Sequence, residues 1–201
     1  MTSYYGQQRP LYVPPSHLDD IRVKLYITIR KTTMETEPPI SKGIVIFGAT
    51  GDLCKRKLIP ALYNLWKKNL LPENFVITGS SRRDPGVQAW KDSLGDYPEE
   101  FFYQLDYIST DLDNVDTLRH LPDYLHDNTY FLSVPPERYG NAVINLKETG
   151  LLDDPDRSRV VIEKPFGYDF KSAGRLQSVV ERHLREKQVY RIDHYLGKDT
   201  V

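Results

Sequence analysis

Side chains that can bind a phosphate or help to move a proton are gathered in one short stretch of this sequence. The segment VYRIDHYLGKDTV, residues 189–201, contains Asp193, His194, Tyr195 and Lys198. Tyrosine, histidine and lysine each donate hydrogen bonds to a phosphate monoester, and Gly197 permits a turn that gathers them. A lone histidine is more often structural, but packing does not readily explain this combination. The cluster predicts a binding site for a phosphorylated substrate.

A lysine follows another apolar segment of the chain. In RVVIEKPFG, residues 159–167, Lys164 comes after a continuous apolar run and precedes Pro165. A lysine in this place can be a solvated cap of a strand. We favour a binding role, because ligands of open α/β sheets lie beyond the carboxyl ends of the strands. The Lys-Pro bond also fixes the direction of the chain there.

Two glycines stand where an earlier apolar run gives way to a helical pattern. In IVIFGATGDLCKRKLIPAL they are Gly48 and Gly51. Glycines at such a turn let backbone amides approach a pyrophosphate, and the positive end of the helix favours the anion. The spacing is G-x-x-G rather than G-x-G-x-x-G, and such a pair is often only a tight turn. Its place after the first buried strand favours nucleotide binding, whereas most of the basic run 55–57 is expected to be a solvated helix face.

The end of the second predicted strand indicates which dinucleotide binds. Sites for NAD carry an acidic residue there, whereas an arginine accommodates the 2′-phosphate of NADP. The segment reads VITGSSRRD, with Arg82 and Arg83 in the place of the acid. The alternative is a charged loop in which an arginine pairs with Asp84. Because a guanidinium makes bidentate contacts with phosphate oxygens, the pattern favours NADP over NAD.

Alternating strand and helix patterns must position these candidates. Apolar segments predict strands at residues 43–47, 74–80, 107–110, 128–134, 159–164 and 188–192. Helical patterns lie between them, around Leu58, Leu62, Leu65 and Trp66 with Pro60 in the first turn, and at residues 87–94, 115–125, 137–149 and 172–186. This order predicts an α/β fold with a doubly wound, mostly parallel sheet of Rossmann type. Residues 1–42 are predicted to be an irregular extension with one edge strand at 21–30.

Composition argues against several classes of function. The chain has 201 residues, enough for one domain with a real core, and its 27 Lys and Arg nearly balance 28 Asp and Glu. We therefore expect no nucleic-acid or membrane partner. One cysteine and five scattered histidines give no disulfide and no metal-ligand spacing. No apolar run approaches the roughly 20 residues that span a bilayer, and no targeting signal is evident, so we expect a cytoplasmic protein.

Five segments together resemble one family. GATGDLCKRKLIPALYNL, GSSRRD, FLSVPPERY, VVIEKPFGYD and RIDHYLGK are similar, in order and spacing, to the blocks of glucose-6-phosphate dehydrogenase. The resemblance covers about residues 43–201 and implies an NADP-binding domain that ends in the substrate-phosphate motif. It implies oxidation of glucose 6-phosphate at C1 to 6-phosphogluconolactone, with hydride transfer to NADP⁺, in the oxidative pentose phosphate pathway.

The resemblance also implies roles for individual residues. Arg82 matches the reader of the 2′-phosphate, Tyr139 a tyrosine on the cofactor side, and Lys164 a lysine between nicotinamide and sugar. Asp193 matches a carboxylate that orients a general-base histidine. The phosphate-binding turn of the cofactor site matches Gly48, Ala49, Thr50, Gly51, Asp52, Leu53, Cys54 and Lys55. The substrate site matches Lys164, His194, Tyr195, Leu196, Gly197 and Lys198.

No residue of this chain matches that histidine, which in the family lies in a second, larger β+α domain. We therefore expect a truncated dehydrogenase that binds NADP⁺ weakly, does not turn over by itself, and forms a homo-oligomer only with the missing domain. The alternative is a stand-alone NADP-binding module or pseudoenzyme. The final GKDTV stops inside a functional turn, which favours truncation. A different NADP oxidoreductase that uses Tyr195 or Lys198 as acid-base is the least favoured hypothesis.

Overall fold

A computed structural model describes residues 43–72, 74–119, 121, 125 and 128–192 of the chain. Within these residues one sheet has the strand order β3-β2-β1-β4-β5-β6, and every neighbouring pair is parallel. The strands are β1 Gly43–Phe47, β2 Val76–Ser81, β3 Leu105–Ser109, β4 Thr129–Leu132, β5 Arg159–Glu163 and β6 Val189–Ile192. The order reverses between β1 and β4, which is where such sheets bind dinucleotides.

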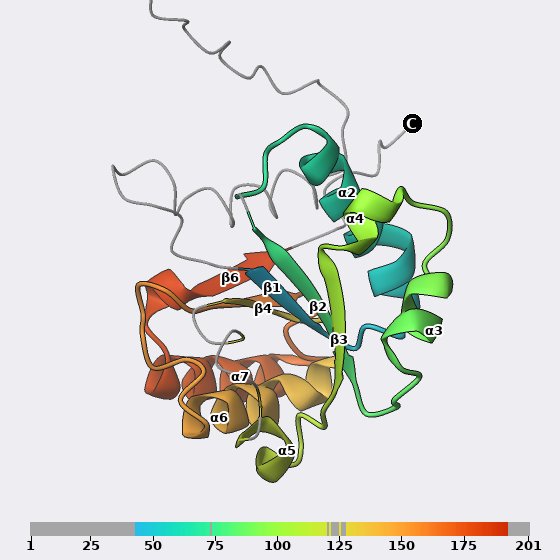
Figure 1. The fold of residues 1–201 in the computed structure, drawn as a ribbon. Coiled ribbons are helices and arrows are strands. Elements are labelled where there is room, and N and C mark those ends of the chain that lie inside the picture. Colours follow the sequence, from blue (N-terminus) through green and yellow to red (C-terminus); the bar gives the residue numbers. More distant parts are fainter. Residues whose placement is uncertain (1–42, 73, 120, 122–124, 126–127, 193–201) are drawn as a thin grey trace, which may run out of the picture.

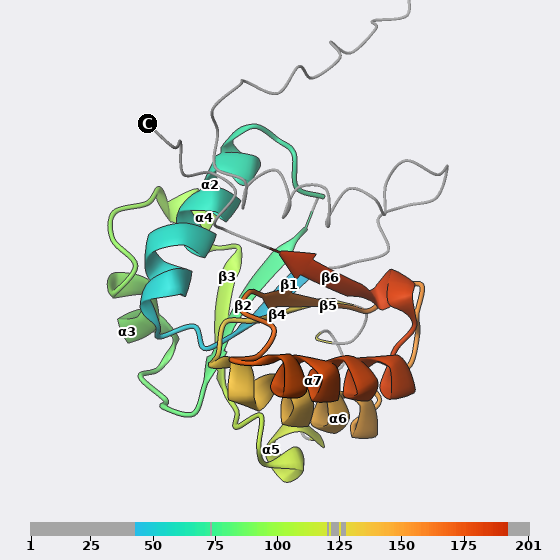
Figure 2. The ribbon, with the colours of Figure 1, turned by 180° about the vertical axis from the view of Figure 1, so that it is seen from behind.

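Helices cover both faces of the sheet. Figures 1 and 2 show α2, α3 and α4 against one face and α5, α6 and α7 against the other. The helices are α2 Ile59–Lys67, α3 Val87–Asp92, α4 Glu99–Phe102, α5 Val115–Arg119, α6 Tyr139–Glu148 and α7 Phe170–His183. Shorter turns are the π-helix η1 Cys54–Leu58 and the 3₁₀ helices η3 Pro136–Arg138 and η4 Glu186–Gln188. The predicted doubly wound α/β fold is confirmed.

The apolar strands hold the layers together because successive side chains point to opposite faces of a sheet. In β1, Ile44 and Ile46 pack into one core cluster with α2, whereas Val45 and Phe47 pack into the other with α6. Each such side chain contributes roughly 1.5–3 kcal/mol when fully buried. Burial on both faces is why β1 reads as a continuous apolar run instead of an alternating one.

Several element boundaries differ from the predictions. The third strand begins at Leu105 rather than residue 107, because Leu105 and Asp106 already pair with β2. Of the helix predicted at 115–125, the structure describes Val115–Arg119 as α-helix α5. The single turn α4 was not predicted because four residues carry too little periodicity. The edge strand predicted at 21–30 and the extension 1–42 lie outside the described residues.

Two predicted helices also begin at other positions. The helix predicted at 137–149 is divided into the 3₁₀ turn η3 and α6, which ends at Glu148. The helix predicted at 172–186 begins at Phe170, because Asp169 caps it and accepts a hydrogen bond of 2.6 Å from the Ser172 amide. None of the helices in the described part of the chain is both long and apolar enough to cross a membrane.

Trp90 on α3 joins the helical layer to the first turn of the sheet. Its side chain is 1% exposed, and its Nε1 donates a hydrogen bond of 3.0 Å to the Ala49 carbonyl. The indole ring lies against Gly79 of β2, where a Cβ atom would stand 2.5 Å from a ring carbon. The missing side chain at Gly79 therefore lets Trp90 reach the turn that follows β1.

We expect Gly79→Ala to lower the free energy of unfolding by about 1–3 kcal/mol, because the added methyl group overpacks the Trp90 ring. The matched control is Gly174→Ala on α7, where an added Cβ meets nothing within 4 Å. An alanine in an exposed helix should stabilise the fold by up to about 1 kcal/mol. Urea unfolding measures both variants. Equal stability of the two would contradict the close packing at Gly79.

Candidate functional site

A cavity of about 500 Å³ lies at the carboxyl ends of four strands, β1 to β4. The strand order reverses within this group: β2 and β3 lie on one side of β1, and β4 lies on the other. The lining residues come from the turns and loops that follow each of these strands. They are Phe47, Gly48, Thr50, Gly51, Ser80, Ser81, Arg82, Arg83, Thr110, Asp111, Leu112, Ser133, Val134, Pro135 and Arg138.

The glycine turn after β1 forms the floor of this cavity. The amides of Gly48 and Ala49 both donate to the Ser80 carbonyl, at 2.8 and 3.0 Å. Gly48 has a φ of +87°, and a Cβ atom there would overlap the Ser133 carbonyl oxygen. The Gly51 amide donates to Gly48 at 2.9 Å, after which the chain becomes helical. Only a glycine at 48 allows the β1, β2 and β4 ends to approach this closely.

The predicted turn residues divide into two groups. Thr50 and Gly51 line the cavity with Gly48, whereas Ala49 and Cys54 are fully buried in the core. The exposed Asp52 lies 3.8 Å from Arg56 in a solvated ion pair. Leu53 and Lys55 are half-buried. The amides of Gly48, Ala49 and Gly51 are used within the turn itself, which therefore offers the Thr50 side chain and the start of a helix to a pyrophosphate.

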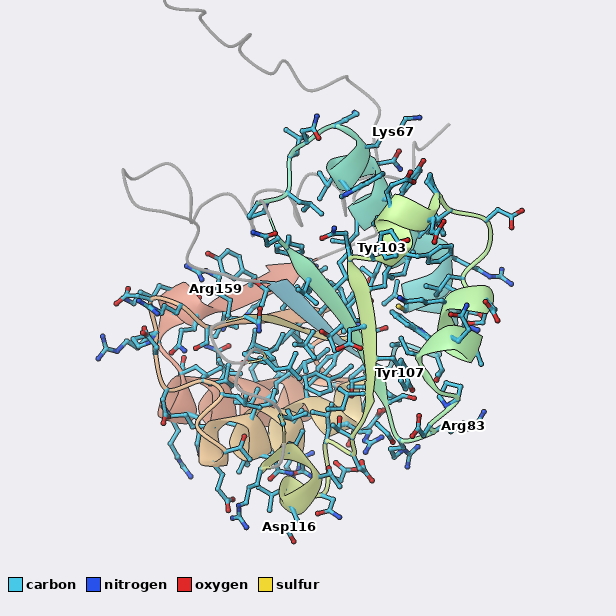
Figure 3. All side chains as sticks on the ribbon, in the orientation of Figure 1. Lys67, Arg83, Tyr103, Tyr107, Asp116 and Arg159 are labelled. Atoms are coloured by element: carbon cyan, nitrogen blue, oxygen red, sulfur yellow. The ribbon has the colours of Figure 1, made fainter. Side chains whose placement is uncertain are left out.

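Two exposed arginines, Arg82 and Arg83, form one rim of the cavity. The loop that carries them is fixed from β3, where the Tyr107 hydroxyl donates a hydrogen bond of 2.6 Å to the Arg83 carbonyl (Figure 3). The Ser81 hydroxyl lies 2.6 Å from the same Tyr107 oxygen. The two residues that directly follow β2 are these arginines, whereas a site for NAD would have a carboxylate there. The rim is therefore suited to an anion.

The opposite rim contains Arg138, which sequence reasoning missed. Its Nη2 donates to Asp111 at 2.8 Å and also to Asp113, both on the loop after β3. Burial opposes the charged guanidinium, but its hydrogen bonds to the carboxylates of Asp113 and Asp111 outweigh burial and raise the pKa of Arg138. These partners are 27 and 25 positions away, so no local pattern links them. The position of Arg138 after the Pro-Pro pair was the only available signal.

Tyr139 and Lys164 do not line the cavity. Tyr139 is 3% exposed, and its hydroxyl donates a hydrogen bond of 3.1 Å to the Glu163 carbonyl at the end of β5. Burial raises the pKa of Tyr139 to about 12. Lys164 follows that strand with an exposed side chain, and its amide donates to Ile192 of β6 at 3.0 Å. The peptide bond from Lys164 to Pro165 is cis.

The hydrogen bond from Lys164 to Ile192 places this lysine beside the strand that leads into the predicted phosphate cluster. The residues of that cluster lie outside the described part of the chain: Asp193, His194, Tyr195, Leu196, Gly197 and Lys198. Across the described segments no group of three or more histidine, cysteine, aspartate or glutamate side chains is arranged to hold a metal ion.

Comparison with known proteins identifies the family. The family model described as glucose-6-phosphate dehydrogenase, NAD binding domain, matches residues 45–201. The chain belongs to the glucose-6-phosphate dehydrogenase family. A glucose-6-phosphate 1-dehydrogenase of Aggregatibacter actinomycetemcomitans is 42% identical over 180 residues, which cover 79% of this chain and 36% of that protein. The corresponding enzyme of Leuconostoc mesenteroides is 34% identical over 178 residues and is covered over 37% of its length.

Solved structures of the glucose-6-phosphate dehydrogenase family have the same fold. One, described as a glucose-6-phosphate dehydrogenase in complex with its substrate glucose-6-phosphate, has a TM-score of 0.69 at 29% identity, over 78% of this chain and 37% of that one. The enzyme from Mycobacterium avium has a TM-score of 0.67 at 30% identity, with the same coverage of 78% and 37%. The chain therefore spans little more than a third of the length of its family relatives.

The Cys54 thiol should be unreactive in the folded chain. Burial raises its pKa to about 12, against a slight opposing effect of Lys55, so almost no thiolate is present at pH 8. We expect a water-soluble aromatic disulfide to label it at least about a hundredfold more slowly than in denaturant, where the thiol has an ordinary pKa. Absorbance of the released thiolate measures both rates. Fast labelling under native conditions would show that the glycine turn opens.

Proposed function

We propose that this chain is the cofactor-binding part of a glucose-6-phosphate 1-dehydrogenase that oxidises glucose 6-phosphate to 6-phosphogluconolactone with NADP⁺. The observation that carries the proposal is the combination of a glycine turn with exposed arginines at the end of β2, around one cavity. Membership of the family and the substrate complex of a relative support the reaction.

The lining of the cavity suggests how the cofactor would be oriented in it. Its pyrophosphate would contact the Thr50 side chain, which lines the cavity, and the positive end of the helix that follows the Gly48–Gly51 turn. Its 2′-phosphate would lie at Arg82, on the rim that the Tyr107 hydroxyl holds in place. The absence of an acidic group there, among the residues that line the cavity near β2, supports NADP over NAD.

The substrate would lie beyond the ends of β5 and β6. Ile192 of β6 accepts a hydrogen bond from the Lys164 amide, and the predicted phosphate cluster follows Ile192 in the sequence. His194, Tyr195 and Lys198 would donate hydrogen bonds to the phosphate of the sugar. The Lys164 ammonium, which has three donors and no acceptor, would hold a sugar oxygen and orient C1.

The chemical step needs a proton acceptor and a hydride acceptor. NADP⁺, when bound, supplies the ring that accepts the hydride from C1. The C1 hydroxyl must lose its proton to a base within about 3 Å, or through one water. Asp193 would orient a histidine base from another part of the enzyme, since a carboxylate that bonds one ring nitrogen leaves the other free to take the proton.

The 201-residue chain by itself should therefore bind NADP⁺ without oxidising glucose 6-phosphate. We expect calorimetry to detect binding and the increase in absorbance from NADPH to be absent, because no residue of the chain matches the base. Joining the chain to the remaining length of a family relative is the matched control, and it should restore turnover. Steady turnover by the isolated chain would contradict the assignment of the base to another part of the enzyme.

Arg82 should determine the preference between cofactors. We expect Arg82→Ala to weaken NADP⁺ by about tenfold or more, because a charge-assisted hydrogen bond contributes about 1.5–3 kcal/mol, and to change NAD⁺ affinity by less than about twofold. The control is Arg175→Ala, an exposed arginine of α7 that does not line the cavity. Calorimetric titration measures both affinities. Equal losses for NADP⁺ and NAD⁺ would show that Arg82 does not read the 2′-phosphate.

A further inference from the structure

We propose that Arg138, clamped by Asp111 and Asp113, contacts the adenine of the bound dinucleotide and forms one wall of the adenine end of the cavity. The inference rests on the proposed function, in which the cavity binds NADP⁺. It adds a contact that reads the base, separate from the contact of Arg82 with the 2′-phosphate.

The two rims of the cavity carry opposite charges. Arg82 and Arg83 are exposed and lie on one rim, and they attract a phosphate group. On the other rim the single positive charge of Arg138 is outnumbered by the two carboxylates that accept its hydrogen bonds. An anionic group gains nothing at that rim. The uncharged part of the nucleotide, its base, is therefore the part that suits it.

The lining next to Arg138 is suited to the faces of a flat ring. Leu112, which is buried, and the side chains of Val134 and Pro135 line the cavity beside it. The Leu112 carbonyl accepts a hydrogen bond of 2.6 Å from Asn145 on α6, which fixes the loop after β3. Apolar residues beside a planar guanidinium are a lining on which an aromatic base can stack.

The guanidinium also has a donor that the protein does not use. The Arg138 side chain is 20% exposed, yet its Nε is buried and has no hydrogen-bond partner. Buried N–H groups in folded proteins nearly always have an acceptor. The Nε atom has almost no accessible surface, so the exposed fifth of the guanidinium side chain, and not this donor, is what a base in the cavity can contact.

The test is the substitution Arg138→Lys, which keeps the positive charge but removes the planar group and the Nε–H donor. Calorimetry with the full chain measures the Kd values of NADP⁺, NAD⁺ and 5′-AMP. We expect all three ligands to bind about five- to tenfold more weakly, with the ratio of NADP⁺ to NAD⁺ affinity unchanged within about twofold. This pattern differs from that of Arg82→Ala, which changes the ratio.

The matched control is Arg119→Lys on α5. Arg119 is also held by two carboxylates, Asp116 at 2.9 Å and Glu148 at 2.7 Å, but it does not line the cavity. We expect the control to leave all three Kd values unchanged. Thermal unfolding midpoints of both variants, measured without ligand, separate a loss of contact from a loss of fold.

A second variant covers the case in which Arg138→Lys does not fold. Asp113→Asn weakens one of the two contacts that orient Arg138 and leaves the guanidinium in place. We expect it to weaken NADP⁺, NAD⁺ and 5′-AMP by similar factors, of about two- to fivefold. Unchanged binding in the folded variant overturns the inference.

Each remaining outcome is decisive. Unchanged affinities in folded Arg138→Lys, or a loss confined to NADP⁺, would overturn the adenine contact and leave the proposed function standing. If the unaltered chain binds none of the three nucleotides, the proposed function fails and the inference fails with it. A uniform loss for all three ligands, without a change in the control, supports the inference.

Discussion

The close approach of three strand ends at Gly48 is the constraint on which the site depends. The Gly48 and Ala49 amides donate to the Ser80 carbonyl after β1, and the Ser133 amide donates to the Phe47 carbonyl at 2.9 Å. The ends of β2, β1 and β4 are thus tied at the point where the strand order reverses. Any side chain at position 48 would separate them, because its Cβ atom has no space beside the Ser133 carbonyl.

The same turn is also held from outside the sheet. The Trp90 indole donates a hydrogen bond to the Ala49 carbonyl and packs over Gly79. The position of the turn therefore depends on how α3 packs on β2. Cys54, at the start of the π-helical turn, is buried beneath it. Side chains that do not line the cavity therefore set the position of the turn that does. Packing in the core, and not contact with a ligand, therefore restricts which residues can occupy positions such as Ala49 and Cys54.

The cavity combines two rims of different chemistry that arise from different parts of the fold. The loop with Arg82 and Arg83 is fixed by Tyr107 on the neighbouring strand β3, and its charges remain exposed. The rim at Arg138 is assembled by ion pairs between η3, which follows β4, and the loop after β3. A parallel sheet brings all these strand ends to one edge, so both rims line the same cavity.

The sequence by itself determined the order of the strands and of the helices other than α4, the glycine turn and the arginines after β2. These features depend on neighbouring residues, through burial on both faces, backbone freedom and position after a strand. Tertiary structure decided the early start of β3, the burial of Tyr139 against the Glu163 carbonyl, and the clamp on Arg138. These depend on strand register and on contacts between residues 24 or more positions apart, which local patterns do not encode.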